Sequence, residues 1–168
     1  MKNTLTVTTP SDLEIVVARN FDAPRALVWE AMSKPEFLKR WLFGPPGWSM
    51  TTCEDDMRTG GKFRWGWDGP DGQKMLMHGM YSEVVPPAAS GSGGRMVRTE
   101  TFEIGCMPQA GEQNCTLTLT DLGTKKTALK IVIKYPNKQS RDGALASGME
   151  RGMAAGYDRL EEMLQAGL

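Results

Sequence analysis

Hydrophobic and polar residues alternate along the middle of the chain, and this alternation predicts antiparallel β-strands. Leucines alternate with threonines over residues 116–120, and aliphatic residues alternate with lysines over residues 129–134. A period of two places one set of side chains on a dry face and the other set in water. The pattern recurs in short runs over residues 48–135, so we expect six consecutive strands there, with loops at residues 86–95 and 105–114.

Helical spacing replaces this alternation near both ends of the chain. After a strand over residues 13–21, Asp22 and Pro24 predict a helix start, and Pro35 divides the following segment into two short helices. Residues 140–168 are expected to form one long helix, because their apolar residues recur on one face with charges opposite. The order is therefore a strand, two helices, six strands and a helix, which is an α+β fold.

Glycines interrupt the apolar stripe of the long helix at a regular spacing. Gly148, Gly152 and Gly156 stand four residues apart, although each glycine costs a helix about 1 kcal/mol relative to alanine. The helix must bury its stripe, and the sheet offers the dry surface that can receive it. Two explanations of the glycines stay open: a close contact with the sheet, or a space that holds a small molecule.

Length and charge exclude several classes of function. A chain of 168 residues is the size of one domain, which we place at residues 13–168 after a flexible segment at residues 1–12. Its 20 basic and 20 acidic residues cancel, so no nucleic acid is expected as a partner. We expect no membrane partner and a cytoplasmic location, because no apolar run could span a bilayer or act as a signal peptide. A monomer and a homodimer remain equally open.

The cysteines and the histidine predict no metal site. Cys53, Cys106 and Cys115 contain no C-x-x-C pair, and together with His78, the single histidine, they match no common metal-binding spacing. An odd number of cysteines in a chain of this kind indicates buried thiols better than a disulfide framework. We expect no metal and no cofactor.

Aromatic residues and methionines are the candidates for a ligand site, although both also fill protein cores. All five tryptophans lie between residues 29 and 67, and Trp41 and Trp48 flank a GPPG turn as possible rim residues. Met75 and Met77 must face away from His78 and Met80, and the sequence does not tell which pair faces inward. The predicted ligand-binding residues are Trp29, Trp41, Trp48, Phe63, Trp65, His78, Met80, Met149, Gly152, Met153 and Tyr157.

Charged residues in the predicted strands are weaker candidates. Arg64, Arg98, Glu100 and Glu103 point to water in the simplest interpretation, whereas an inward charge would need a partner and could hold the polar end of a ligand. His78 could act as a general base, but no partner is visible at a defined spacing, so a structural histidine is preferred and no catalytic residue is predicted. The acidic run at residues 54–56 receives no role.

Five stretches, taken in order, resemble a known family: FDAPRALVWEAMSKPEFLKRW, GPPGW, GGKFRWGWDGPDG, HGMYSEVVPP and ALASGMERGMAAGYDRL. They are similar to the family named for the activator of the ninety-kilodalton heat-shock protein ATPase, within the SRPBCC or START-like superfamily. The resemblance extends over about residues 13–165. It implies a helix-grip fold, in which a curved antiparallel sheet of six or seven strands wraps around a long C-terminal helix.

The resemblance also implies a cavity between the sheet and the helix, which in many members of the superfamily holds apolar molecules. The chain departs from the family pattern in two places. Where the family usually has W-W-G-P, this chain has Trp41, Leu42, Phe43, Gly44 and Pro45, which adds a residue at the expected mouth of the cavity. The loop after Pro87 is also longer than the family's usual turn.

Three functions are consistent with these observations. The first is a non-catalytic protein that encloses a small, largely apolar ligand, driven by burial of apolar area. The second is a co-chaperone-like module that binds a chaperone through an exposed apolar patch and has a filled interior. The third is a cyclase or dehydratase that combines His78 with an inward arginine or glutamate. The resemblance does not choose between them, because one fold carries many activities.

Overall fold

One curved antiparallel sheet wraps around the C-terminal helix in this computed structural model, which describes residues 2–105 and 107–168. Cys106 lies outside the described residues. The strands are β1 (Thr6–Thr8), β2 (Glu14–Phe21), β3 (Ser49–Asp55), β4 (Lys62–Asp68), β5 (Lys74–Val85), β6 (Arg95–Ile104), β7 (Met107–Asp121) and β8 (Thr127–Lys134). The helices are α1 (Arg25–Ser33), α2 (Pro35–Trp41), α3 (Lys138–Ala146) and α4 (Met149–Ala166). The predicted α+β class and helix-grip arrangement are confirmed.

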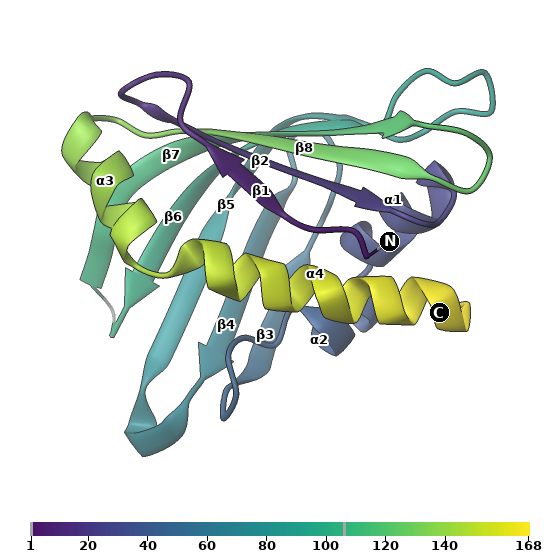
Figure 1. Cartoon of the computed structure of the whole chain (residues 1–168). Helices are drawn as coiled ribbons and strands as arrows, with labels where there is room; N and C mark the ends of the chain where they lie inside the picture. Colours follow the sequence, from purple (N-terminus) through teal and green to yellow (C-terminus); the bar gives the residue numbers. More distant parts are fainter. Residues whose placement is uncertain (1, 106) are drawn as a thin grey trace.

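The strand order brings the two ends of the chain together. It runs β1-β2-β8-β7-β6-β5-β4-β3, so each strand from β3 to β8 pairs with its neighbour in sequence while β2 pairs with β8. Figure 1 shows α4 crossing the concave side of this sheet, with both termini near the C-terminal end of α4. The helix therefore closes over one face of the sheet, and strands β3 and β1 form its two edges.

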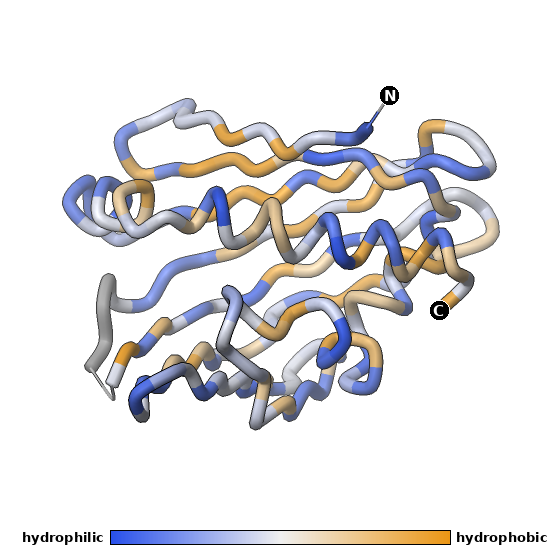
Figure 2. Tube along the Cα trace, turned by 60° about the horizontal axis from the view of Figure 1, so that its bottom comes forward, coloured by the Kyte–Doolittle hydropathy of each residue, from blue (hydrophilic) through white to orange (hydrophobic). Residues whose placement is uncertain are grey.

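The predicted alternation is confirmed along the strands, where hydrophilic and hydrophobic residues follow one another in Figure 2. On β8, Leu129, Ile131 and Ile133 are buried, and across the strand pair they meet buried residues of β2 such as Ile15 and Val17. Period-two spacing suffices to predict this face because nothing breaks the register between β2 and β8.

Two strand predictions need correction. The expected loop at residues 105–114 is largely strand, because β7 begins at Met107 and pairs with β6. A register shift between Thr101 and Glu103 and a positive φ of 75° at Gly111 interrupt the alternation that would have marked this strand. The sheet also has eight strands instead of six or seven, since residues 6–8, in the segment expected to be flexible, pair with β2.

The long C-terminal helix is divided. Helix α3 starts at the cap residue Asn137, whose side chain accepts a hydrogen bond from the Ser140 backbone N–H at 2.8 Å, and it ends before Ser147. Gly148 then has a φ of +83°, a left-handed conformation that is costly for residues with a side chain, and α4 begins at Met149. The prediction of one continuous helix over residues 140–168 is therefore wrong.

Among the described residues, no helix is both long and apolar enough to cross a bilayer.

Candidate functional site

The face of the sheet that α4 crosses, which we call the inner face, carries the candidate site. Residues that pair across antiparallel strands share a face. Trp65 of β4 is buried and pairs with Met77 of β5, which in turn pairs with Phe102 of β6. Tyr81 of β5 pairs with Arg98 of β6 on the same face. Aromatic, sulfur-containing and charged side chains therefore lie together on the inner face.

A buried ion pair lies in the middle of this face. Arg98 donates from Nε to Glu100 Oε2 at 2.8 Å, and its Nη2 lies 2.7 Å from the same oxygen. The guanidinium also lies 4.7 Å from the ring centres of both Phe63 and Trp65. Gln113 of β7 donates to Glu100 Oε1 at 2.9 Å. Each oxygen of the carboxylate thus has a donor, and the pair is held rigidly between strands and rings.

A second carboxylate, Asp55 at the end of β3, faces the same interior. It accepts a hydrogen bond from the Tyr81 hydroxyl at 2.7 Å and one from the Trp65 indole N–H at 3.2 Å. Burial raises the pKa of Asp55, while the hydrogen bond from Tyr81 and the charge of Arg98 oppose that shift. The inner face therefore contains two carboxylates and one guanidinium between β3 and β6.

Buried hydroxyl and thiol groups surround these charges. Tyr157 of α4 packs against Phe21 and Trp41, with ring centres 5.8 and 5.7 Å away. Burial raises the pKa of Tyr157 well above its usual value, so its hydroxyl stays protonated at neutral pH. Burial also raises the pKa of the Cys115 thiol and of Tyr135. These groups can donate hydrogen bonds but are not activated nucleophiles.

Apolar side chains continue the inner face toward the β4–β5 turn. Met77 and Phe102 are half-buried, and the next inward pair, Met75 and Ile104, lines a surface hollow of about 410 Å³ together with Trp48. Successive inward residues on a strand are about 7 Å apart, so Ile104 and Glu100 are about 14 Å apart along β6. A continuous row thus leads from an open apolar hollow to the buried ion pair.

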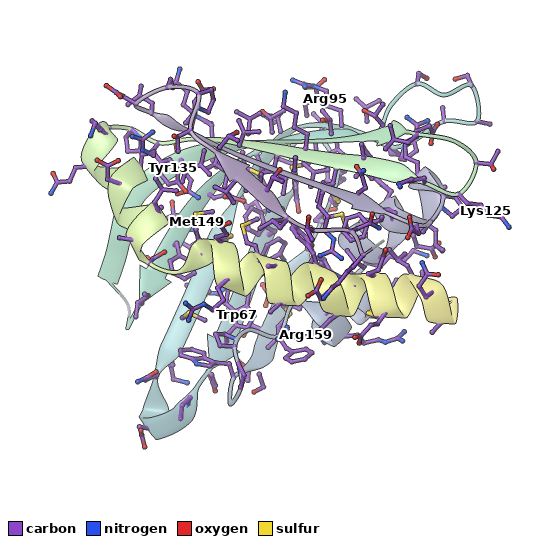
Figure 3. The ribbon with its side chains drawn as sticks, in the orientation of Figure 1. Trp67, Arg95, Lys125, Tyr135, Met149 and Arg159 are labelled. Atoms are coloured by element: carbon purple, nitrogen blue, oxygen red, sulfur yellow. The ribbon has the colours of Figure 1, made fainter. Side chains whose placement is uncertain are left out.

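Helix α4 covers this row unevenly. Met149 and Met153 are half-buried and follow each other at a four-residue spacing that ends at the buried Tyr157. Figure 3 shows Met149 at the start of α4, on the same side of the molecule as Tyr135. The N-terminal half of α4 therefore contributes its methionines to the interior, while residues from Gly156 onward are packed more tightly.

The three glycines of the stripe serve different purposes. Gly148 supplies the left-handed turn between α3 and α4, with φ +83°. Gly152 is exposed, and an added Cβ would meet nothing within 4 Å. Gly156 lies against α2, where a Cβ would be 3.7 Å from the Trp41 carbonyl oxygen, an ordinary contact distance. The sequence left two explanations of these glycines open. The described contacts do not support the first one, close contact with the sheet.

The segment beside the hollow is fixed to α4. Arg159 donates to the carbonyl oxygens of Trp41 at 3.0 Å and Gly44 at 2.9 Å, and its guanidinium stacks on the Phe43 ring (Figure 3 labels Arg159). The Trp67 indole N–H donates to the Leu42 carbonyl oxygen at 2.6 Å. The added residue by which this chain departs from the family pattern therefore lies in a segment that Arg159 and Trp67 both hold in place.

The predicted ligand residues fall into three groups. Phe63, Trp65, Met149, Met153 and Tyr157 belong to or border the inner face, and Trp48 lines the hollow. Trp41 is core instead of rim, because it is 4% exposed and its indole donates to the Ala31 carbonyl oxygen. Trp29 is a half-buried residue of α1, and Gly152 is exposed on α4. Binding by these residues stays a prediction.

His78 and Met80 lie on the outer face of the sheet. His78 pairs with Arg64 and Thr101, its side chain is 41% exposed, and its Nε2 lies 3.7 Å from Glu103 Oε1. Met80 is 48% exposed. Because the inner face carries Arg98 and Glu100, His78 cannot form one catalytic centre with them, and neither outer residue can line the interior. Among the described residues, no cluster of three metal-ligating side chains occurs.

Sequence reasoning did not include the central polar residues in the predicted site. Arg98 and Glu100 were weaker candidates for the polar end of a ligand, with water as the simpler interpretation, Asp55 received no role, and Gln113 was not considered. A signal was present in the sequence, because Arg98 and Glu100 lie on the same strand face as Phe102. An apolar residue on that face predicts that the two charges point inward with it.

A second hollow, of about 310 Å³, lies at the other end of the sheet around Gly94 and Leu119.

Comparisons with known proteins agree with this architecture. The family described as Activator of Hsp90 ATPase homolog 1-like protein matches residues 22–165. A crystal structure from Rhodobacter sphaeroides is 29% identical, covers 96% of this chain and 98% of its own, and superimposes with a TM-score of 0.83. A crystal structure from Mycobacterium smegmatis, 22% identical over 98% of this chain and 99% of its own, has a TM-score of 0.81 and supports the fold.

The AHSA1 protein of Silicibacter pomeroyi is 16% identical over 92% of this chain and 99% of its own, with a TM-score of 0.71. No curated protein sequence matches the chain.

Proposed function

The chain belongs to the Activator of Hsp90 ATPase homolog 1-like family, and from this premise we propose that it is a non-catalytic protein that binds a small, largely apolar molecule between the inner face of the sheet and α4. The family fold is compatible with ligand binding and with co-chaperone roles. The proposal retains the cytoplasmic location expected from the sequence.

One observation carries the proposal. Trp48, Met75 and Ile104 line a hollow, and the next inward residues of the same two strands are Met77 and Phe102, beyond which lies the buried ion pair. Apolar walls that end at a few fixed polar groups are typical of sites for small molecules. The apolar part of a ligand would supply the affinity, and the polar groups would orient it.

The energetics favour this use of the half-buried side chains. Covering 100 Å² of apolar surface contributes about 2.5 kcal/mol, before the cost of immobilising the ligand is subtracted. Met77, Met149 and Met153 supply flexible thioethers, which adapt to different ligand shapes. The site can therefore accept a ligand without a rigid, pre-formed cavity, through small rotations of methionine side chains.

The test is binding of N-phenyl-1-naphthylamine, a neutral apolar dye whose fluorescence rises in a dry environment, followed by native mass spectrometry of the freshly purified protein. Met77→Trp fills the inner face and should weaken dye binding about tenfold, which is about 1.4 kcal/mol. Met80→Trp, on the outer face of the same strand, is the matched control and should bind the dye like the unchanged protein. Equal affinities of the two variants, or no dye binding at all, would refute the proposal.

A second candidate, a module that binds a chaperone, rests on the family description, which names an activator of the Hsp90 ATPase. The large exposed hydrophobic residues that such a surface could use are Met80, Val85, Ile104, Leu122 and Leu145, and they belong to several different elements. Stimulation of a purified Hsp90-type ATPase by this protein would favour the second candidate. An unchanged ATPase rate would count against it.

A further inference from the structure

The residues around the hollow restrict the shape of the ligand. We infer that the bound molecule carries a flat aromatic ring system, which lies against the Trp48 indole in the hollow, and that it is not a purely aliphatic chain. This inference rests on the proposed function and names the ligand class for the open end of the same site.

The Trp48 indole is held flat against the connection between β4 and β5. A Cβ added to Gly69 would lie 2.4 Å from Trp48 Cε2 and 2.6 Å from both Cδ2 and Cζ2. These nearly equal distances to three adjacent ring atoms place the added Cβ above the plane of the ring. Carbon atoms in contact lie about 3.5–4.0 Å apart, so a side chain at residue 69 would displace the indole. The backbone of Gly69 therefore covers one face of the ring.

The rest of the Trp48 indole is available to the hollow. Trp48 is half-buried and lines the hollow, whereas Gly69 is not among the described residues that line it. Because Gly69 covers one face, the indole meets the hollow with its other face or with its edge. Aromatic rings prefer offset-stacked and edge-to-face contacts with one another. Either orientation of Trp48 can therefore receive a second aromatic ring.

The other walls of the hollow also suit an aromatic ring. Met75 and Ile104 pair across β5 and β6, and Ile104 is 46% exposed. A methionine thioether makes favourable contacts with aromatic rings. Lys74 is the one charged residue among the described residues that line the hollow, and its Nζ lies 3.1 Å from the Asp68 carboxylate. The hollow thus offers apolar surface, and its lining cation already has a counter-charge.

The first experiment compares 2-naphthol with decahydro-2-naphthol on the unmodified protein at pH 7.5, by isothermal titration calorimetry. The two alcohols share one carbon skeleton and one hydroxyl group, but only 2-naphthol is flat and aromatic. Burial of apolar area alone predicts equal affinities or tighter binding of the saturated alcohol, which has the larger surface. Contact with the Trp48 ring should instead make 2-naphthol bind about 2- to 10-fold more tightly.

The outcomes of this comparison separate the inference from the proposed function. Binding of the saturated alcohol that is as tight as that of 2-naphthol, or tighter, overturns the inference but leaves the proposed function intact, because an apolar molecule still binds. Failure of both alcohols and of N-phenyl-1-naphthylamine to bind removes the proposed function instead.

The second experiment tests the role of Trp48. Trp48→Leu keeps an apolar side chain and should reduce the preference for 2-naphthol to about one, while Trp48→Phe, which keeps an aromatic ring, should retain most of it. Full preference in Trp48→Leu overturns the assignment to Trp48.

Nuclear magnetic resonance of the unmodified protein gives a readout that does not depend on the stability of the leucine variant. The indole N–H signal of Trp48, identified by its loss in Trp48→Phe, should shift when 2-naphthol is added. The Trp41 signal is the internal control and should stay in place, because its N–H donates to the Ala31 carbonyl oxygen in the core. A shift of the Trp41 signal without one at Trp48 places the aromatic ring elsewhere and overturns the inference.

Discussion

The guanidinium carbon of Arg159 lies 3.9 Å from the centre of the Phe43 ring, so a side chain of α4 covers the segment that follows α2. The same guanidinium donates to the carbonyl oxygens of Trp41 and Gly44. One arginine thus satisfies two backbone groups and stacks on a ring, which a lysine cannot do in the same geometry. The segment between α2 and Trp48 is therefore fixed to α4.

Replacing Arg159 should release this segment. Arg159→Ala and Arg159→Lys should each destabilise the protein by about 1–3 kcal/mol, because both lose the forked hydrogen bonds and the stacked ring. Urea unfolding followed by tryptophan fluorescence measures the change. Arg151→Ala, an exposed arginine on the same helix, should stay within about 0.5 kcal/mol of the unchanged protein. A lysine variant as stable as the original would show that charge alone matters at this position.

Two glycines of the α4 region should respond with opposite signs. Gly148→Ala forces a side chain into the left-handed conformation and should cost about 1–2 kcal/mol. Gly152→Ala has free space around the new Cβ and a helical backbone, so it should gain about 0.5–1 kcal/mol. Thermal unfolding of both variants checks the prediction. A loss of stability in Gly152→Ala would mean that this position is not the open helical site described.

Neutralising the carboxylate of the buried ion pair should have a large effect on the stability of the protein. Glu100→Gln leaves the Arg98 guanidinium buried without a counter-charge and should cost about 3–5 kcal/mol of unfolding free energy. Glu103→Gln, on the outer face of the same strand, should cost less than about 1 kcal/mol. Urea unfolding measures both variants. Similar losses in both would contradict the difference in burial between the two faces.

Asp158 predicts a dependence of stability on pH. The hydrogen bond from the buried Arg19, at 2.7 Å, is the main reason that the pKa of Asp158 is lowered in the folded protein. Because the folded pKa lies below the unfolded one, the stabilisation is present above the unfolded pKa of about 3.9 and is lost as the pH falls through the folded pKa.

Asp158→Asn should therefore be less stable than the original protein at pH 7, and the difference should shrink toward zero as the pH falls through the folded pKa of Asp158. Urea unfolding at pH 7, 4 and 3 measures this trend. Asp142→Asn is the control, since Asp142 pairs with Lys138 and Arg141 at the surface, so its replacement should change the stability less than Asp158→Asn does at pH 7. A difference that stays constant with pH would exclude the ion pair as its cause.

The fold could be predicted from sequence wherever local and tertiary preferences agree. The alternation of Leu129, Ile131 and Ile133 identifies their buried face, and Pro35 marks the start of α2 as expected. The strand over residues 107–121 was missed because bulges change the period of the pattern. The break before α4 was missed because Gly148 fits a helix by spacing, and its positive φ depends on the connection to α3.

The candidate site was less predictable than the fold, because it depends on which strand face turns inward. Met75 and Met77 could not be separated from His78 and Met80 by spacing, and only the pairing with the buried Trp65 decides between them. The link between Asp55 and Tyr81 joins β3 to β5 across β4, a relationship of three strands that no local pattern contains. Polar side chains with apolar neighbours on both sides are the most useful signal in such cases.

The pairing of β2 with β8 has a consequence for how the chain is made. The Thr127 hydroxyl donates to the Ala23 carbonyl oxygen, 104 positions earlier in the sequence, at 2.7 Å. During synthesis, β2 leaves the ribosome long before β8, the strand that completes its hydrogen bonds. The apolar face of β2 therefore stays uncovered while most of the chain is translated. The sheet can close only when β8 has emerged, and the interior is covered only after α4 has followed it.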